Sequence, residues 1–329
     1  MNASCSIELH QDEINTLIHI SNKITFDPSI NPEQYCKQIK ELSKLIPLHL
    51  QNALTQFKKN GSDTGFLLIK GLPVDETILP NTPPGNTYNL GQQTILAKIQ
   101  SLFICILGEM IAYEAECYGN LFQDIVPIQS MEKMQTSLGS GQELEIHTEQ
   151  AFSQLRPDIL SLACLRGNSN AFTYILHVNE IIKHMSPSEI DLLRQPLWKT
   201  GIDLSFKLYG NEFIEGDIRG SFPIVSGLDR DTDRDPQLLF DQDLMTGITK
   251  ESQKMIDKII DIYYQHRIEY NLKPGEIIFI DNNRAVHGRS SFIPKYDGFD
   301  RFLVRCFAVF DYEKSEYARN GRTVLAIYS

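Results

Sequence analysis

The amino-acid sequence predicts a mostly β protein with flanking helices, arranged as a β-sandwich or jelly roll. From about Leu121 onward, short β-rich runs follow one another, several of them separated by turn signals. The chain before that point has the apolar spacing of helices. With 329 residues, 42% of them hydrophobic, it is long enough to bury a large core. We predict one domain over residues 1–329, with a largely helical part at 1–118 and a jelly-roll core with a lid and a helical insert at 119–315.

The elements of the N-terminal part follow from apolar spacing and from proline and glycine. Residues 34–58 repeat apolar side chains at helical intervals, and Pro47 is expected to kink or divide this helix. The apolar run at residues 65–71 is bounded by glycines and predicts a buried strand. Residues 80–86 (PNTPPGN) predict a loop, and a second helix is expected from about Gly91 to Glu116.

The β-rich part contains four clear strand candidates and one helix. The predicted strands are Ile159–Cys164, Thr173–Val178, Glu276–Ile280 and Phe302–Phe310. A helix is predicted over Thr249–His266, with Thr249 capping its start. No linker interrupts this part, so we expect the helix to be an insert within one domain.

Composition excludes several classes of function. Asp and Glu outnumber Lys and Arg by 42 to 31, and a net charge of −11 argues against a nucleic-acid partner while it suits a cationic small molecule. The six scattered cysteines lack the spacing of a zinc ribbon or redox dithiol. No signal peptide is visible, and the most apolar stretch, residues 102–112, is too short to cross a membrane. We therefore predict a cytoplasmic protein without a membrane partner, and a homo-oligomer stays open.

The sequence LEIHTEQAF contains a candidate metal site. On a strand, His147 and Glu149 project to the same face, because side chains alternate with period two. His287, just past a predicted strand, is the best third ligand. Two histidines and one carboxylate leave three positions of an octahedron open, as non-haem iron(II) oxygenases require. The same residue types could also hold catalytic zinc.

Two arginines follow the second histidine in an apolar run. Arg301 lies fourteen positions after His287, and on a strand it shares a face with Leu303 and Arg305. An arginine that points into the interior lowers the stability of the fold unless an anion pairs with it, because the guanidinium stays protonated. Structural salt bridges would explain both residues, but beside a metal site we favour two carboxylate clamps.

Together these motifs resemble a known family. The segments HTEQAF and DNNRAVHGRS, with Arg301 beyond them, are similar to the clavaminate synthase-like Fe(II)/2-oxoglutarate oxygenases, and most similar to the free L-lysine dioxygenases among them. The resemblance covers roughly residues 65 to 315. It implies a distorted double-stranded β-helix (jelly roll) with iron(II) at one open end. It also implies that Arg301 grips the distal carboxylate of the co-substrate 2-oxoglutarate, that Thr173 adds a hydroxyl contact, and that O2 is the oxidant.

Paired acidic residues predict where a basic side chain binds. Asp241 and Asp243 would put two carboxylates on one side of an extended segment, where like charges repel unless a cation lies between them. The resemblance assigns them to the cationic end of the substrate, for which a lysine ammonium is well suited. Asp203 and Ser205 resemble a second pair that binds the substrate side chain. Tyr209–Ser221, with three glycines, predicts a lid over the substrate, with a plain solvent loop as the alternative.

The remaining contacts implied by the resemblance concern the α-carbon of the substrate. Glu116 matches a position near the α-amine, and Glu149 could share that contact through its non-ligating oxygen. Arg305 would then take the α-carboxylate. These groups complement a free basic amino acid at both ends.

The predicted reaction is hydroxylation of free L-lysine at a side-chain methylene, which gives hydroxylysine, succinate and CO2. Carbon 4 is favoured over carbon 3. A free L-arginine hydroxylase is the nearest alternative, since the acidic pair suits a guanidinium too. Outside this class, a zinc hydrolase or a non-catalytic, cupin-like binding protein stays open.

Overall fold

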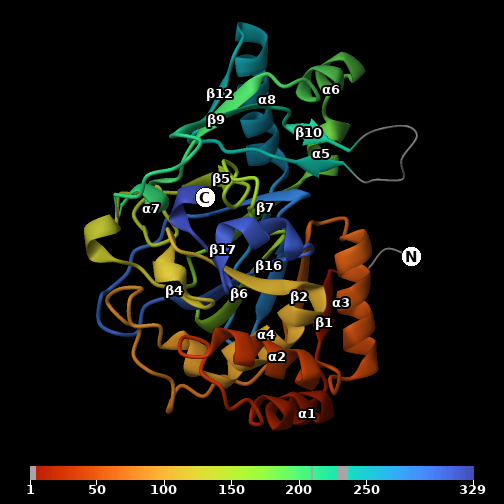
Figure 1. The fold of residues 1–329 in the computed structure, drawn as a ribbon. Coiled ribbons are helices and arrows are strands. Elements are labelled where there is room, and N and C mark those ends of the chain that lie inside the picture. Colours follow the sequence, from red (N-terminus) through yellow and green to blue (C-terminus); the bar gives the residue numbers. More distant parts are fainter. Residues whose placement is uncertain (1–4, 209, 228–235) are drawn as a thin grey trace.

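The computed structural model describes residues 5–208, 210–227 and 236–329, so Tyr209 of the predicted lid lies outside the described residues. Two β-sheets of unequal size form the body of the molecule, and helices cover it at the bottom, right and top of the view (Figure 1). The expected class, mostly β with flanking helices, is confirmed.

The larger sheet runs through the centre of the molecule. Its strands, in spatial order, are β1 (Ser6–Glu8), β2 (Phe66–Lys70), β14 (Ile277–Asp281), β6 (Ile159–Arg166), β16 (Phe302–Val309), β3 (Glu109–Tyr113), β18 (Thr323–Val324) and β17 (Arg319–Asn320), with β4 (Gln123–Ile125) also beside β16. Strands β14, β6 and β16 pair antiparallel, and every residue in them is buried. All were predicted within a few residues, because continuous apolar runs are typical of strands buried on both faces.

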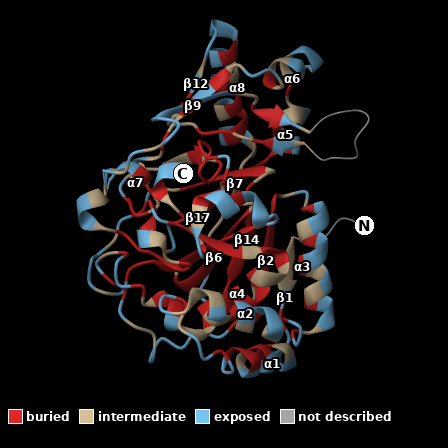
Figure 2. Ribbon diagram, viewed as in Figure 1, coloured by how far each residue is buried: buried red, intermediate tan, exposed pale blue. Residues whose placement is uncertain are grey.

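Four helices cover the outer face of the larger sheet. The helices are α1 (Gln11–Ser21), α2 (Pro32–Ser43), α3 (Leu48–Asn60) and α4 (Ile95–Leu107). Helix α4 packs on β6 and β16, and the other three helices pack on α4, which is why most residues of α4 are buried (Figure 2). Pro47 is the N-cap residue of α3, so the predicted division of the first helix is confirmed.

The predicted second helix is too long. It begins with a 3-10 turn, η1 (Gly91–Gln93), continues as α4 and ends at Leu107, and β3 follows directly. A Cβ atom on Gly108 would lie 2.5 Å from the carbonyl oxygen of Val309, so this glycine lets the chain turn against β16. Apolar residues continue into β3 because it pairs with β16, and continuous apolarity does not distinguish a buried helix from a buried strand.

The smaller sheet carries His147 and His287, two of the three predicted metal ligands. Its order is β13 (Ile268–Tyr270), β7 (Thr173–His177), β15 (Ala285–Arg289) and β5 (Leu144–His147), all antiparallel. One face packs on the larger sheet through residues such as Ile175. The other face packs on α5 (Val178–Lys183) and α8 (Lys250–His266) through residues such as Leu176. Thr249 caps α8 by accepting a hydrogen bond from the Ser252 amide, as expected.

Smaller elements complete the fold near the site. A third sheet joins β12 (Met245–Gly247), β8 (Trp198–Gly201) and β9 (Ile218–Phe222), and β10 (Val225–Ser226) pairs with β11 (Gln237–Leu238). Helices α6 (Pro187–Leu193) and α7 (Leu204–Lys207) lie beside them. Because β9 pairs with β8, the end of the predicted lid is a strand and not a loop. Among the described helices, none combines the length and apolarity that a membrane crossing needs.

Candidate metal centre and substrate pocket

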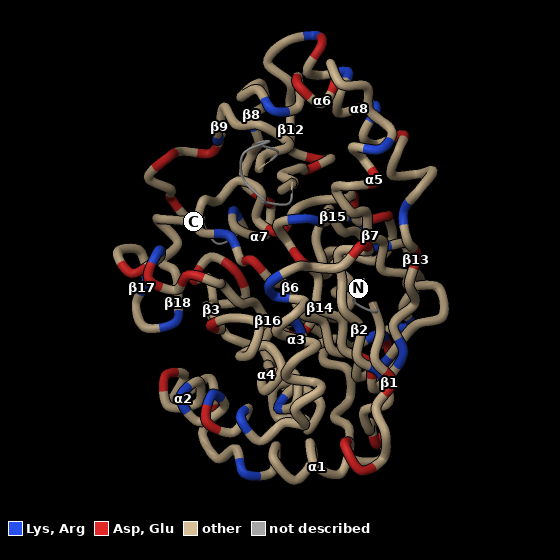
Figure 3. Tube along the Cα trace, turned by 90° about the vertical axis from the view of Figure 1, so that its right-hand side faces the viewer, with Lys and Arg blue, Asp and Glu red and all other residues tan. Residues whose placement is uncertain are grey.

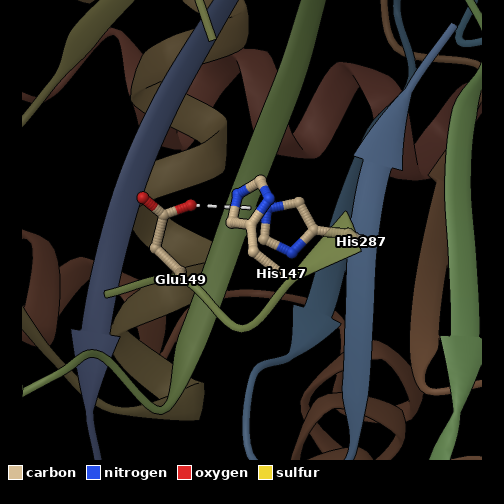
Figure 4. A group of neighbouring side chains, drawn as sticks. All are labelled: His147, Glu149 and His287. Carbon is tan, nitrogen blue, oxygen red and sulfur yellow. Dashed lines mark ion pairs between the residues drawn. The ribbon is translucent and has the colours of Figure 1, made fainter. Parts of the chain in front are cut away.

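His147, Glu149 and His287 meet at the end of β5. His147 and His287 are direct partners across β5 and β15, and their ring centroids lie 4.5 Å apart. Glu149 Oε2 lies 3.3 Å from His287 Nε2 (Figure 4). One donor atom from each residue lies within 4.8 Å of those of the other two, so the structure brings the three predicted ligands together.

The protonation of these side chains suits a divalent metal ion. His147 Nδ1 donates to the carbonyl oxygen of Glu145 at 2.8 Å, because a carbonyl can only accept, and this leaves Nε2 with a free lone pair. Burial, together with His147, lowers the pKa of His287 to about 4, so its ring is neutral. Burial opposes ionisation of Glu149, but Arg305 and His287 lower the pKa of this carboxyl to about 2. Two imidazoles and one carboxylate are a set of ligands that fits iron(II).

Glu149 reaches the site in a different way from the one expected. Strand β5 ends at His147, and Glu149 lies in the turn beyond it. The side chain of Asn282 holds that turn: its Oδ1 accepts from the Glu149 amide at 2.7 Å, and its Nδ2 donates to the Glu149 carbonyl at 3.1 Å. Sequence analysis missed Asn282; the only signal was a run of polar residues between two buried strands.

Arg301 is a buried cation that has no acidic partner among the described residues, although its guanidinium lies 5.9 Å from the centre of the Phe292 ring. It lies directly before β16, is 6% exposed, and has no hydrogen bond or ion pair with any other residue that the structure describes. Burial lowers its pKa to about 10, so it remains charged. It lines one cavity together with Thr173, Glu149 and His287. An unpaired arginine is costly, and its position facing the metal ligands fits an anion that chelates a metal there.

Arg289 also lines this cavity, and its role there was not predicted. Arg289 lies two residues after His287 on β15, and it donates hydrogen bonds to the backbone carbonyls of Gly139 and Gln142. Burial and the nearby charge of Arg301 lower its pKa to about 9. The alternation of β15 was the available signal, since residues two apart on a strand share a face.

Arg305 differs from Arg301 because it has acidic partners. It contacts a carboxylate oxygen of Glu116, lies 3.2 Å from Glu149 Oε1, and donates from Nε to Gln123 Oε1 at 2.7 Å. Glu116 also accepts from Gln150 Nε2 at 3.1 Å, and burial raises its pKa to about 7 against the influence of Arg305. The alternative interpretation, in which both arginines form structural salt bridges, therefore fits Arg305 but not Arg301.

Acidic side chains line the open side of the metal centre. One pocket is bordered by Glu116, Glu149, Asp203, Ser205, Asp241, Asp243 and Arg305, among others. Burial, reinforced by Asp203 and Asp243 and opposed by His147, raises the pKa of Asp241 to about 7. Asp203 accepts hydrogen bonds from both the amide and the hydroxyl of Ser205, at 2.7 Å each. All the predicted substrate residues therefore border one pocket.

The segment of Asp241 and Asp243 is not extended, contrary to expectation. Asp241 forms a β-bridge with His147, but residues 242–244 make a turn. The turn forms because the Leu244 amide donates to Asp241 Oδ1 at 2.8 Å, a local side-chain bond that competes with strand pairing. Asp241 is buried, whereas Asp243 is exposed at the pocket rim.

Comparisons with known proteins agree with this geometry. Residues 41–307 match the family model "Taurine catabolism dioxygenase TauD, TfdA family". The chain is 43% identical to an L-lysine 3-hydroxylase of Catenulispora acidiphila, over 99% of this chain and 90% of the relative. It is 25% identical to an L-lysine 4-hydroxylase of a Flavobacterium species, over 87% of this chain and 78% of the relative.

Two solved structures superpose over nearly the whole chain. Asparagine oxygenase in complex with Fe(II), 2S,3S-3-hydroxyasparagine and succinate has a TM-score of 0.89 and 28% identity, over 98% of this chain and 99% of that one. The non-heme iron oxygenase OrfP in complex with Fe, succinate and (3S)-hydroxy-L-Arg has a TM-score of 0.84 and 26% identity, over 98% of this chain and 100% of that one. The chain belongs to the TauD/TfdA family of dioxygenases, among its clavaminate synthase-like oxygenases.

Proposed function

We propose that this protein is an Fe(II)/2-oxoglutarate-dependent hydroxylase of free L-lysine. His147, Glu149 and His287 hold the iron, and Arg301 with Thr173 binds the distal carboxylate of 2-oxoglutarate. The observation that carries the proposal is the buried Arg301, which has no acidic partner among the described residues and lines a cavity together with all three predicted metal ligands. With O2, the bound iron and 2-oxoglutarate supply the oxidation: one oxygen atom enters a substrate C–H bond, and 2-oxoglutarate becomes succinate and CO2.

The pocket complements each charged group of lysine. Arg305 binds the α-carboxylate, and Glu116 with the second oxygen of Glu149 binds the α-amine, so the acids that neutralise Arg305 in the free protein would turn to the substrate ammonium. The side-chain ammonium lies among Asp203, Ser205, Asp241 and Asp243, where a compact cation relieves the repulsion between carboxylates. Contacts at both ends fix the methylenes between them relative to the iron, and this positioning is the contribution of the protein.

Carbon 3 is the proposed position of the new hydroxyl. Sequence analysis favoured carbon 4, without a residue that distinguishes the two. Two findings support carbon 3: 43% identity to an L-lysine 3-hydroxylase against 25% to an L-lysine 4-hydroxylase, and the 3-hydroxylated product in both structures described above. The likeness to these structures also supports a distorted double-stranded β-helix as the fold.

A free L-arginine hydroxylase is the second candidate. OrfP, with hydroxy-arginine bound, superposes closely, and the acidic side chains of the pocket also suit a guanidinium. A planar guanidinium prefers paired acceptors that lie in its own plane. An ammonium can rotate its three N–H groups and donate hydrogen bonds to oxygens that are not coplanar. Asp241 directly precedes the turn at residues 242–244 and is buried, whereas Asp243 lies within that turn and is exposed, and this arrangement favours the ammonium.

Product analysis tests the proposal. The protein is incubated with iron(II), 2-oxoglutarate, ascorbate and each free amino acid, and succinate is quantified while the product is examined by mass spectrometry and NMR. We expect L-lysine to stimulate succinate formation and to gain one oxygen atom at carbon 3. Stimulation by L-arginine but not by L-lysine would contradict the proposal. Turnover that survives without O2 and 2-oxoglutarate would point to the zinc hydrolase.

A further inference from the structure

A second group of metal-ligand side chains lies on the outer side of the smaller sheet, away from the catalytic pocket. Glu180 is in α5, His184 is the C-cap residue of that helix, and His266 is the last residue of α8. Helices α5 and α8 contact each other and lie close together in two perpendicular views (Figures 1 and 3). None of the three residues borders a described cavity of the active site.

The three side chains lie close together. His184 Nε2 lies 2.9 Å from Glu180 Oε1, and His266 Nδ1 lies 3.8 Å from the same oxygen. One donor atom from each residue lies within 4.8 Å of the others, as is also true of His147, Glu149 and His287. The two imidazole rings stack with centroids 4.0 Å apart and an angle of 16° between their planes. Because a ring nitrogen binds a metal within the plane of its ring, one of these two side chains rotates when both bind the same ion.

The local fold fixes this arrangement. Glu180 and His184 are four residues apart, so they share one face of α5. The two helices are joined through the apolar core that contains Ile181 from α5 and Ile259 and Ile262 from α8, which sets the position of His266. The side chains are each about one-third exposed, at 31% for Glu180 and 32% for both histidines, so water can reach an ion there.

The charges at this point also suit a cation. The hydrogen bond with His184 lowers the pKa of Glu180, so the carboxylate is ionised. Lys183 lies 3.2 Å from Glu180 Oε1, but its side chain is 68% exposed and can move into solvent at little cost. Neutral imidazole nitrogens with one carboxylate are ligands for zinc and similar transition metals, whereas Ca²⁺ and Mg²⁺ prefer oxygen.

We propose that Glu180, His184 and His266 form a second, non-catalytic site for a transition-metal ion of the zinc type, which joins the end of α8 to α5. Strand β7, which carries Thr173, leads directly into α5, so an ion there would hold the outer helices against the strand layer of the active site. The site is independent of the proposed reaction.

Zinc binding by a chain without the catalytic ligands tests this inference. In a His147→Ala/His287→Ala background, we expect isothermal titration calorimetry to show one bound Zn²⁺ per chain, and excess Mg²⁺ should not compete. Adding His184→Ala and His266→Ala should abolish that binding, and Glu180→Gln should weaken it at least tenfold. His19→Ala, which removes an exposed histidine on α1, is the matched control and should leave binding unchanged.

Two further measurements keep the test decisive. Far-UV circular dichroism establishes that each variant is folded, and thermal unfolding should show Zn²⁺ raising the midpoint of the background variant but not of the variant that lacks His184 and His266. Binding should also weaken as the pH falls, because protons compete with the metal ion for the imidazole nitrogens. The absence of zinc binding in the background variant, or equal binding after removal of His184 and His266, would overturn the inference.

Discussion

Replacing Arg301 with methionine should stabilise the protein in the absence of co-substrate and remove its response to 2-oxoglutarate. Burial lowers the pKa of Arg301 from the ordinary value of an arginine to about 10, and at about 1.4 kcal/mol per pKa unit this corresponds to a cost of about 3 kcal/mol for burying the charge. Methionine carries no charge and fills a similar space, so Arg301→Met should recover a large part of that free energy.

The same substitution should damage co-substrate binding severely. A hydrogen bond to a charged group contributes about 1.5–3 kcal/mol, so the loss of a bidentate contact should weaken 2-oxoglutarate binding by a hundredfold or more. Urea unfolding, with and without 2-oxoglutarate and iron(II) under argon, measures both effects. The free energy of unfolding of the wild type should rise when 2-oxoglutarate is added. That of Arg301→Met should be higher than that of the wild type without 2-oxoglutarate and should not change when it is added.

Arg305→Met is the matched control, because it places the same substitution four residues further along the chain. Removing Arg305 leaves Glu116 and Glu149 as buried carboxylates without their cation, which should destabilise the protein by about 3–5 kcal/mol. If Arg301→Met is also destabilised, or if 2-oxoglutarate still stabilises it as much as wild type, the assignment of Arg301 as an unpaired co-substrate clamp is wrong.

Three other substitutions test the metal centre and the pocket. His147→Ala should abolish lysine-dependent succinate formation while the circular dichroism spectrum is retained; appreciable turnover would refute its role as a ligand. With a pKa of about 7, Asp241 gains charge as pH rises, so kcat/KM for lysine should rise through pH 7 in wild type. Asp241→Asn should lower kcat/KM and flatten that rise, and an unchanged profile would contradict the assignment. Gly288→Ala should cost about 1–3 kcal/mol and weaken iron binding, because its Cβ would lie 2.6 Å from the Leu144 carbonyl oxygen and push β5 away from β15; unaltered unfolding and iron titration would argue against it.

The parts of the structure that sequence predicted well are those governed by local patterns. The runs that form β6, β14 and β16 are continuous and apolar, and Pro47 marks a helix boundary by its chemistry. The end of α4 was missed, because Gly108 acts through its approach to Val309, a residue two hundred positions away.

The same distinction applies to the site. His147, Glu149 and His287 belong to recognisable motifs, and the structure brings them together. Asn282 and Arg289 act on backbone groups of distant segments, the Glu149 turn and the chain before β5. The alternation of β15 places Arg289 on the same face as His287, but no pattern in the sequence reveals the backbone groups that either residue binds.

The active site is divided between two sheets that share an apolar layer. The histidines and Thr173 belong to the smaller sheet, whereas Arg301 and Arg305 lie at or in a strand of the larger one. In the proposed complex, a small sliding of one sheet over the other would therefore move the iron along the side chain of a lysine whose α-carboxylate stays with Arg305. Substitutions in the layer between the sheets, at positions such as Ile175 and Leu303, can thus shift oxidation from one methylene to the next while every residue that touches the substrate is kept.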